Sequence, residues 1–534
     1  MPSRRSYLIA PLLIVVCSVA AGLFSGDNVA AASPADDPVS QSMKSFTTVF
    51  DAVEQNFADK VDADRAIYNG AVPGMLRTLD PHSNFFDPKA YAAMREDQRG
   101  QYFGVGMQVG PRNNRTMVMW PFEVSPAYRA GLRPGDIIVQ VGDKKTDGLN
   151  TSEIADLLRG PRGTKVQVYI SRSGQPKPLM FEIVRDAIAR STVPEVFWLK
   201  PGIAYAKIES FGETTSRDFQ EKLRQLGENN IKGMVLDLRG NPGGLLNEGV
   251  EIAGHFLKKN ELVVSHRGRA QPNKNYYARS DNGGKTYPVV AVVNRSSASA
   301  AEIVSGALQD HDRGWVLGEA TFGKGLVQTV FPLSENTGLA LTTAHYYTPS
   351  GRLIQRDYSH ISFLDYYYRA KTEEKNAADV KMTDSGRTVY GGGGIAPDEK
   401  WEAPKLNKFQ IEVLRKSGFL MFSAHYFGPK DDVRMAKGWE PDETVVNEFH
   451  RYLLDEKYEF TEADFTANHQ WVKEQLKREM YVTAFSYEQS RVVNIQQDPE
   501  IAKAVDSMPK AAALLENAKK LLVQRVGQPE RAAR

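Results

Sequence analysis

The spacing of hydrophobic positions changes repeatedly along the middle of the chain. Between residues 189 and 404, short apolar runs typical of buried strands precede segments with an apolar residue every three or four positions, typical of helices. We expect strands at 203–208, 234–238, 289–293 and 315–317, and helices at 216–226, 245–257 and 300–308. Strands that alternate with helices predict a sheet covered by helices.

Residues 98–188 show a different pattern, with short alternating runs separated by Gly- and Pro-containing turns. The expected strands are 116–120, 137–141, 164–170 and 179–184, and one helix is expected at 152–158. This pattern predicts a β-rich module ahead of the α/β segment.

The flanking regions have mainly helical periodicity. Residues 40–97 place Phe46, Val49, Phe50 and Val53 on one side of a helix, after a linker at 33–39. Residues 405–534 are also helical by pattern, and 371–385 is a charged surface insertion. The chain is therefore predicted to be a multidomain α/β (α+β) protein with regions at 40–97, 98–188, 189–404 and 405–534. The last region has three open roles: clamping substrate, holding a homo-oligomer or adaptor, or packing on the core.

The N-terminus has the layout of an export signal. Arg4 and Arg5 precede an apolar run over residues 7–24, and small residues follow at 29–32. This order predicts a signal peptide over residues 1–32 and a location in the periplasm or cell envelope. A run of this length also suits an uncleaved anchor, so membrane association through residues 7–24 is the alternative.

Composition excludes several classes of protein. Lys and Arg number 67 against 65 Asp and Glu, so nucleic-acid binding is not expected. Cys17 is the only cysteine and lies within the apolar run, which excludes a disulfide framework and a cysteine zinc site. The nine histidines form no His-Glu-x-x-His pattern, so we expect no metal and no cofactor.

A glycine-containing loop begins the β-rich module. Glycines let a loop present backbone N–H groups to an anion such as a chain-end carboxylate, and the next strand can pair with an extended peptide. The loop predicts a peptide-binding site formed by Tyr102, Phe103, Gly104, Val105 and Gly106.

A second stretch in this module, residues 130–136, reads Ala-Gly-Leu-Arg-Pro-Gly-Asp. With the loop, it resembles a PDZ domain of the bacterial protease type. By that resemblance, the helix that carries Ile154, Leu157 and Leu158 lines the peptide groove. The alternative for the two leucines is the core of the module itself.

Ser299 lies where the strand 289–293 leads into the helix 300–308. At such a junction, free N–H groups of the helix N-terminus face developing negative charge, which suits the nucleophile of an acyl transfer. The alternative is structural, because Ser299 and Glu302 have the spacing of a capping box.

A serine hydroxyl needs a base, and Lys324 is the candidate. Burial lowers the pKa of a lysine and makes it a usable base, and Gln328 is placed to orient it. A surface loop lysine is the alternative. Residues 318–324 also match a phosphate-binding loop, but Gly325 stands where Mg²⁺ binding requires Ser or Thr. Residues 327–331 predict a strand where that loop requires a helix, which disfavours nucleotide binding.

Together these segments resemble the C-terminal processing peptidases, tail-specific Ser/Lys proteases that carry a PDZ domain. The quoted motifs are Ser-Ala-Ser-Ala-Ala-Glu-Ile at 297–303 and Gly-Glu-Ala-Thr-Phe-Gly-Lys-Gly-Leu-Val-Gln at 318–328, with 25 residues from Ser299 to Lys324. Residues 79–83 (Leu-Asp-Pro-His-Ser), 236–244 (Leu-Asp-Leu-Arg-Gly-Asn-Pro-Gly-Gly) and 392–398 (Gly-Gly-Gly-Ile-Ala-Pro-Asp) agree with it. The resemblance spans residues 40–400.

The resemblance implies an exported serine endopeptidase with a core of crotonase/Clp-like type that acts through an acyl-enzyme. Its substrates are proteins or peptides with free C-termini. The implied roles are nucleophile for Ser299 rather than Ser297, general base for Lys324, orienting group for Gln328, and oxyanion-hole donors for the N–H groups of Gly243 and Ala300. It also makes Arg159 a candidate for regulating the site, with a solvated turn as the alternative. A binding scaffold with an inactive site is the competing function.

Overall fold

The computed structural model describes residues 38–270, 272–279, 285–359, 365–366, 379–430 and 432–526. The expected signal or anchor segment lies outside these ranges. The chain divides into two compact units, residues 1–74 and 75–534. Within the first unit, α2 (Pro38–Asn56), α3 (Ala63–Ala66) and a π-helical turn (Ile67–Ala71) lead into α4 (Val72–Arg77), which ends in the second.

The catalytic region expected at 189–404 contains a six-stranded sheet. Its order is β10-β11-β12-β15-β16-β21, parallel except for the antiparallel β10–β11 pair. The strands are β10 (Val196–Lys200), β11 (Ile203–Lys207), β12 (Gly233–Asp237), β15 (Val289–Val293), β16 (Trp315–Gly318) and β21 (Glu399–Lys400). The predicted strand at 289–293 is confirmed, and the other three predicted strands differ from the observed ones by at most one residue at either end.

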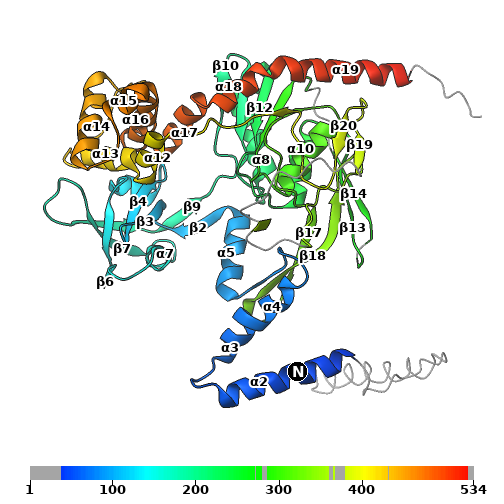
Figure 1. Ribbon diagram of the computed structural model, residues 1–534, viewed down its shortest axis with the longest axis horizontal. Helices are drawn as coiled ribbons and strands as arrows, with labels where there is room; N and C mark the ends of the chain where they lie inside the picture. Colours follow the sequence, from blue (N-terminus) through cyan, green and yellow to red (C-terminus); the bar gives the residue numbers. More distant parts are fainter. Residues whose placement is uncertain are drawn as a thin grey trace, which may run out of the picture. The chain divides into compact units, whose positions relative to one another are not determined.

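Helices bury both faces of this sheet. On β12, Met234 and Leu236 pack toward α8 (Thr215–Leu226), α9 (Leu246–Gly254) and α10 (Ala300–Asp310), whereas Val235 faces the C-terminal helices. The other cover consists of α17 (Tyr487–Gln496), α18 (Pro499–Asp506) and α19 (Met508–Val526), drawn in red over the sheet in Figure 1. Because successive strand residues point to opposite faces, a continuous apolar run is required for a sheet covered on both sides.

A second, antiparallel sheet consists mostly of strands that fall between those of the first sheet in sequence. Its order is β1-β18-β13-β14, and β17 also pairs with β18. The strands are β1 (Asn84–Phe86), β13 (Leu262–Arg267), β14 (Lys274–Tyr277), β17 (Leu326–Pro332) and β18 (Gly338–Tyr347), and a separate hairpin joins β19 (Val380–Met382) to β20 (Thr388–Tyr390). The strand expected after Lys324 is confirmed as β17. The strand β1 was not expected, because three residues are too few for a period-two pattern.

The β-rich module follows α5 (Pro88–Arg99). Its main sheet has the order β3-β4-β5-β7-β8, with β6 on β5, and β2 pairs with β9. The elements are β2 (Gln101–Gly104), β3 (Met107–Arg112), β4 (Arg115–Pro121), α6 (Pro126–Ala130), β5 (Ile137–Val141), β6 (Lys144–Lys145), α7 (Thr151–Leu158), β7 (Lys165–Ser171), β8 (Leu179–Val184) and β9 (Asp186–Ala189). The predicted strands 137–141 and 179–184 are confirmed residue for residue.

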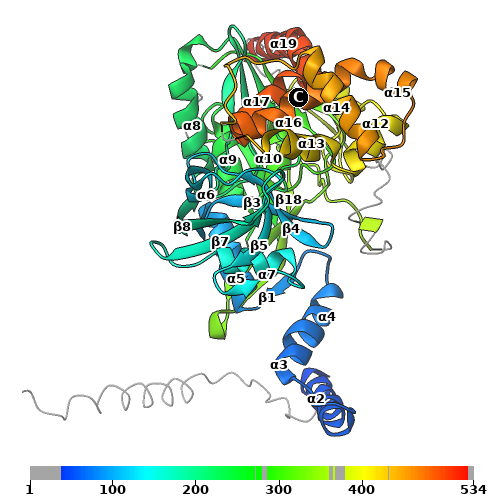
Figure 2. The same cartoon turned by 90° about the vertical axis from the view of Figure 1, so that its left-hand side faces the viewer.

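The remaining helices form a bundle with its own hydrophobic core. They are α12 (Lys408–Arg415), α13 (Gly418–Phe427), α14 (Glu443–Asp455), α15 (Glu462–Ala467) and α16 (His469–Ala484). Figures 1 and 2 both place this bundle beside the β-rich module. The Trp120 and Tyr487 rings stack at 4.1 Å, the Tyr128 hydroxyl donates to the Phe485 carbonyl, and Arg133 donates to the Lys430 carbonyl. The C-terminal region therefore packs on both the module and the catalytic sheet.

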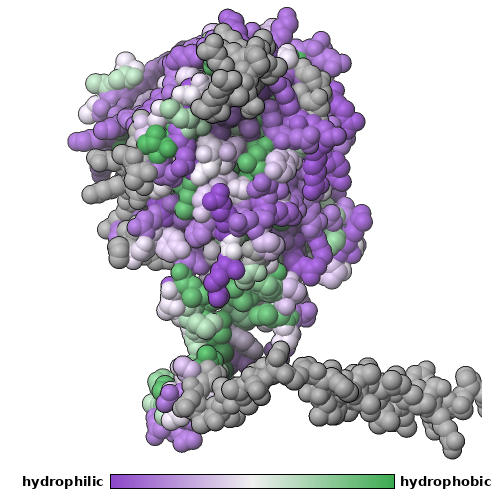
Figure 3. Space-filling model, turned by 90° about the vertical axis from the view of Figure 1, so that its right-hand side faces the viewer, coloured by the Kyte–Doolittle hydropathy of each residue, from purple (hydrophilic) through white to green (hydrophobic). Residues whose placement is uncertain are grey.

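Most of the surface seen in Figure 3 is hydrophilic, and hydrophobic residues gather in a smaller part of it. Within the described ranges, no helix combines the length and hydropathy needed to span a membrane. The helix α2 nevertheless exposes apolar side chains at Val39, Met43, Phe46, Val49 and Val53.

A buried ion pair fixes α17 to the catalytic region. Arg491 donates to Glu195 Oε2 at 2.9 Å, and its Nε lies 2.6 Å from Oε1 of the same carboxylate. Glu195 is 6% exposed, and Arg491 also contacts Glu209. Burial raises the pKa of Glu195 to about 7 although Arg491 opposes this. Removing the partner of a buried charge is costly because the remaining charge has lost both water and its counter-ion.

We expect Arg491→Ala to lower the free energy of unfolding by about 3 kcal/mol at pH 8. The loss should shrink below pH 7, because a protonated Glu195 tolerates burial. Arg415→Ala is the matched control: Arg415 pairs with Glu412 at 2.6 Å but is 66% exposed, so about 1 kcal/mol or less is expected. Urea unfolding of both variants measures this, and equal losses would contradict the role assigned to Arg491.

Candidate active site

Ser299 lies at the first turn of α10, directly after the loop that leaves β15. Its backbone has φ 54° and ψ −114°, a conformation that a residue with a side chain rarely adopts. Such strain costs about 1–3 kcal/mol and persists where surrounding contacts impose it. One of those contacts is the hydroxyl of the buried Tyr346, which donates to the Ser299 carbonyl at 3.1 Å.

Glu302 joins the serine to the loop that carries the lysine. Its side chain is fully buried, and Oε2 accepts from the N–H groups of Ser299 (2.8 Å) and Lys324 (2.9 Å). Its Oε1 accepts from the Gly323 N–H (2.7 Å) and the Thr321 hydroxyl. The contact with the Ser299 N–H is the glutamate half of a capping box. The contacts with residues 321–324 are not local, so the carboxylate does more than cap a helix.

Lys324 is held by a chain of side-chain and backbone contacts. Its Nζ donates to Gln328 Oε1 at 3.0 Å, and the Gln328 amide donates to the carbonyl of His82. Because the Gln328 amide nitrogen is hydrogen-bonded to His82, the amide oxygen faces the lysine. The structure brings together the lysine and glutamine that the sequence singled out, and it adds His82 as a backbone acceptor.

Burial shifts the protonation of both basic side chains at this site. It lowers the pKa of Lys324, although the carboxylates of Glu302 and Asp80 favour the charged ammonium. It also lowers the pKa of His82 to about 4, and the positive charge of Lys324 acts in the same direction. His82 is therefore neutral near pH 7, and its Nε2 lies 3.0 Å from the Tyr366 hydroxyl.

The Leu-Asp-Pro-His-Ser stretch forms a tight loop at the edge of the site. Asp80 Oδ1 accepts from the N–H groups of His82 and Ser83, both at 2.7 Å, and Oδ2 accepts from the Ser83 hydroxyl. The Ser83 hydroxyl in turn accepts from the Thr342 N–H of β18 at 3.1 Å. The loop thus fixes the His82 carbonyl that orients Gln328.

The Asn-Pro-Gly-Gly turn lies against Ser299. A Cβ at Gly243 would come within 2.6 Å of the Ser299 Cβ, so a side chain does not fit there. The Gly243 N–H, expected to be an oxyanion-hole donor, donates instead to Asn241 Oδ1 at 2.8 Å. Asn241 is buried, and its geometry closes this turn on itself. In the part of the chain that the structure describes, the N–H groups of Gly244 and Ala300 have no acceptor.

The Gly-Gly-Gly-Ile-Ala-Pro-Asp stretch supports the lysine loop from the other side. Ile395 donates through its N–H to the Thr321 hydroxyl at 2.7 Å, and Thr321 donates back to the Ile395 carbonyl. Gly394 has φ 81° and lies so close to Thr321 that a Cβ would meet its carbonyl oxygen at 2.6 Å. The glycine is thus required by both space and conformation.

Ser297 is occupied by structural contacts. It is fully buried, its hydroxyl donates to the Leu238 carbonyl at 2.8 Å, and it accepts from the Asn294 N–H at 2.9 Å. Of the two serines, only Ser299 is partly exposed at the site. Among the described residues, no three His, Cys, Asp or Glu side chains are arranged to hold a metal ion.

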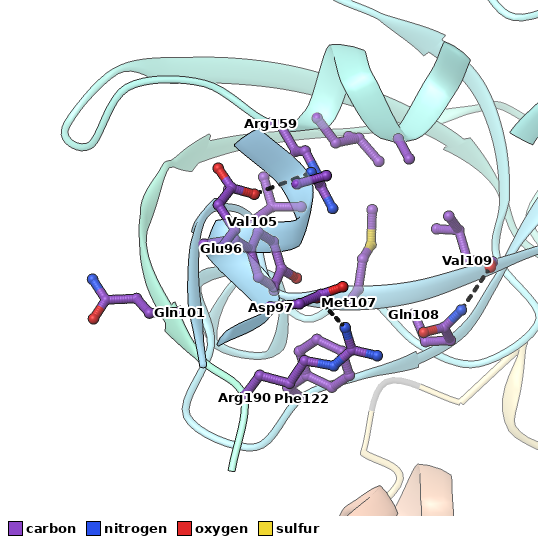
Figure 4. A pocket seen from close by; sticks show the side chains of 16 residues that line it. Glu96, Asp97, Gln101, Val105, Met107, Gln108, Val109, Phe122, Arg159 and Arg190 are labelled. Atoms are coloured by element: carbon purple, nitrogen blue, oxygen red, sulfur yellow. Dashed lines mark hydrogen bonds and ion pairs between the residues drawn. The ribbon is translucent and has the colours of Figure 1, made fainter. Parts of the chain in front are cut away.

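A cavity of about 310 Å³ lies between α5, the loop 102–106, β3 and the end of α7 (Figure 4). Tyr102, Gly104, Val105, Gly106 and Leu158 line it, as the sequence predicted. Three other expected groove residues lie elsewhere. Ile154 is fully buried in the module's core, Leu157 packs against that core, and Phe103 is 42% exposed outside the cavity.

The helical period explains this difference. Ile154 and Leu158 share one face of α7, but only the C-terminal end of that face reaches the cavity, together with Ala155. Ala155 and the α5 residues Ala93, Glu96 and Asp97 were missed, because no local pattern places α5 beside this groove. Arg159 pairs with Glu96 at 3.4 Å and lies 5.2 Å from the centre of the Tyr102 ring.

Two regions of the chain match known protein families. Residues 202–360 match peptidase family S41, and residues 119–172 match a PDZ domain. The chain is 40% identical over 315 residues to a carboxy-terminal-processing protease of Bartonella bacilliformis, covering 58% of this chain and 72% of that protein. It is 32% identical over 350 residues to the carboxy-terminal processing protease CtpB of Bacillus subtilis, covering 63% and 72%. A solved photosystem II D1 C-terminal processing protease shares 26% identity over 68% of this chain and 88% of that one, with a TM-score of 0.35.

Glu302→Gln should slow the reaction of Ser299 with a fluorophosphonate about 100-fold, because the amide nitrogen cannot accept the hydrogen bonds that position the serine and the lysine loop. The pH midpoint of labelling should also fall, since loss of the carboxylate charge no longer favours the protonated Lys324. Glu516→Gln, which removes an exposed partner of Lys519 on α19, is the control and should label normally. An unchanged rate and midpoint for Glu302→Gln would refute this positioning role.

Proposed function

Because the chain belongs to the carboxy-terminal-processing proteases of peptidase family S41, we propose that this serine-type peptidase cleaves its substrates with Ser299 and Lys324. The observation that carries the proposal is the link between the two residues through Glu302. One carboxylate oxygen, Oε2, accepts hydrogen bonds from the backbone N–H groups of both Ser299 and Lys324. A shared acceptor fixes the relative position of the two peptide units that carry nucleophile and base.

The reaction requires the neutral form of Lys324, which burial favours by lowering the pKa of the amine. Neutral Lys324 Nζ takes the proton of the Ser299 hydroxyl as the oxygen attacks the scissile carbonyl carbon. The resulting ammonium then donates that proton to the leaving amine as the peptide bond breaks, which leaves an ester between Ser299 and the substrate. Lys324 next takes a proton from a water molecule as the water oxygen attacks the ester carbonyl. The ammonium returns that proton to the Ser299 oxygen as the ester bond breaks and the acid product leaves. Gln328 Oε1 orients the Nζ by accepting a hydrogen bond from it.

The negatively charged oxygen of the tetrahedral intermediate requires hydrogen-bond donors close to Ser299. The Ala300 N–H is the first of α10, and it lies beside Ser299 with the positive end of the helix dipole. The Gly243–Gly244 turn supplies the second donor. The Gly243 N–H serves if its bond to Asn241 gives way on substrate binding, and the neighbouring Gly244 N–H is already without an acceptor within the described residues.

The PDZ domain gives the substrate class. The cavity between β3 and α7 combines a glycine loop with an apolar floor of Val105, Met107 and Leu158. This combination accepts a carboxylate next to an apolar side chain, as in the free C-terminus of an unfolded or processed protein. We therefore place the recognition of the chain end in the PDZ domain and the cut at Ser299.

Ser299→Ala and Lys324→Ala should each lower kcat for β-casein cleavage by at least about 10³-fold while leaving the melting temperature nearly unchanged. Lys324→Arg should be equally inactive, because arginine keeps its proton at any pH where the protein is folded. Arg415→Ala serves as the control with normal activity. Near-normal turnover by purified Lys324→Ala would exclude the Ser/Lys mechanism, and absence of cleavage by the wild-type protein would favour a binding scaffold.

We also propose that the protein is exported, on the basis of Arg4, Arg5 and the apolar run at residues 7–24. Cell fractionation followed by N-terminal sequencing measures this. The expected product lies in the periplasm or cell envelope and begins after residue 32 if the signal is cleaved, or at Met1 in the membrane fraction if it is an anchor. Full-length protein in the cytosol would contradict export.

A further inference from the structure

The PDZ cavity has a charged rim that its apolar floor does not require. Arg159 and Arg190 line the cavity, and Glu96 and Asp97 line it from α5. Figure 4 shows Glu96 pointing toward Arg159 and Asp97 toward Arg190. The distances are 3.4 Å for the Arg159–Glu96 pair and 2.9 Å for the Arg190–Asp97 pair.

Both arginines are anchored at the carboxylate-binding loop. A Cβ at Gly104 would lie 3.7 Å from the Arg159 Cα, so the arginine begins directly beside the loop. The Arg190 N–H donates to the Gly100 carbonyl at 2.8 Å, just ahead of the same loop. The Tyr102 ring beneath the Arg159 guanidinium keeps that cation near the groove whether or not Glu96 is paired with it.

The two acids are weakly held. The side chains of Arg159 and Glu96 are 49% and 41% exposed, and those of Arg190 and Asp97 are 71% and 70% exposed. Ion pairs this exposed contribute little to stability and exchange readily with other anions. They nevertheless put a carboxylate on each of two cations that line the same cavity as the loop proposed to bind a peptide's terminal carboxylate.

We propose that Glu96 and Asp97 compete with the carboxylate of the substrate's C-terminus for Arg159 and Arg190. This inference rests on the proposed capture of chain ends by the PDZ domain. The two acids of α5 neutralise the groove's cations in the absence of substrate, and a peptide with a free carboxylate after an apolar residue displaces them. Chain ends without that charge, and internal acidic side chains that cannot reach the loop, gain nothing from the exchange.

The alternative is that the two ion pairs only fasten α5 to the PDZ domain. The two interpretations predict opposite changes in binding. If the pairs only fasten α5, removing the acids loosens the groove and weakens peptide binding. If the acids compete, removing them exposes two cations and tightens the binding of a free carboxylate.

The test uses the full chain with the substitution Ser299→Ala, so that the probe is not cut. The probe is a fluorescein-labelled peptide ending in leucine, with either a free carboxylate or a C-terminal amide, and fluorescence anisotropy gives its Kd. The variant Glu96→Gln/Asp97→Asn should bind the carboxylate peptide about three- to tenfold more tightly at low salt. The gain should shrink at high salt, and the amide peptide should show none.

Glu182→Gln is the matched control, because Glu182 pairs with Lys165 at 2.7 Å with similar exposure but away from the cavity, and it should leave both Kd values unchanged. If the double variant melts early, Glu96→Gln and Asp97→Asn alone should each give part of the gain. Unchanged or weaker carboxylate binding, or an equal gain for the amide, would overturn the inference. If the Glu96/Asp97-intact protein shows no preference for the carboxylate over the amide, the proposed chain-end capture itself fails.

Discussion

One buried carboxylate fixes the geometry of the proposed active site. Glu302 has four hydrogen-bond donors around its two oxygens, and they come from two segments that are about 20 residues apart. An unpaired carboxylate in this position would be strongly disfavoured, so the donors must stay in place as long as the protein is folded. The strained backbone of Ser299 and the loop that carries Lys324 are therefore held by the same group.

The remaining family motifs stabilise this arrangement through hydrogen bonds to the segments around it. Asp80 closes the loop whose carbonyl orients Gln328, Asn241 closes the turn against Ser299, and Ile395 holds Thr321 in contact with Glu302. Each motif is distant in sequence and is linked to Lys324 or to the segment around Ser299 through at most three hydrogen bonds. The C-terminal helices also join separate parts of the chain, because they cover one face of the six-stranded sheet and contact the PDZ domain.

Local sequence patterns were sufficient for most strands and helices of the PDZ domain and the catalytic sheet. The strands at 137–141 and 289–293 were predicted with their observed bounds, because each is a buried run bounded by turn residues. The family resemblance then singled out Ser299, Lys324 and Gln328, and the structure brings the last two into hydrogen-bonding contact. Contacts that depend on tertiary structure could not be predicted from the sequence. The spacing of Ser299 and Glu302 is the same for a simple capping box as for a carboxylate that also binds residues 321–324. Likewise, nothing in the sequence of α5 shows that Glu96 and Asp97 face a groove formed by later residues.

The central claim is that Lys324, whose pKa is lowered by burial, is the base. The most direct measurement is the pH dependence of kcat/KM for peptide cleavage by the wild-type protein and by His82→Gln. Activity requires the deprotonated amine, so kcat/KM should rise with pH through one ionisation that lies below the ordinary lysine pKa of about 10.4. The midpoint should be nearly the same in His82→Gln, because the pKa of His82 is about 4 and the imidazole stays neutral throughout the rise. A midpoint at the ordinary lysine value, or one between pH 4 and 6.5 that disappears in His82→Gln, would contradict the account.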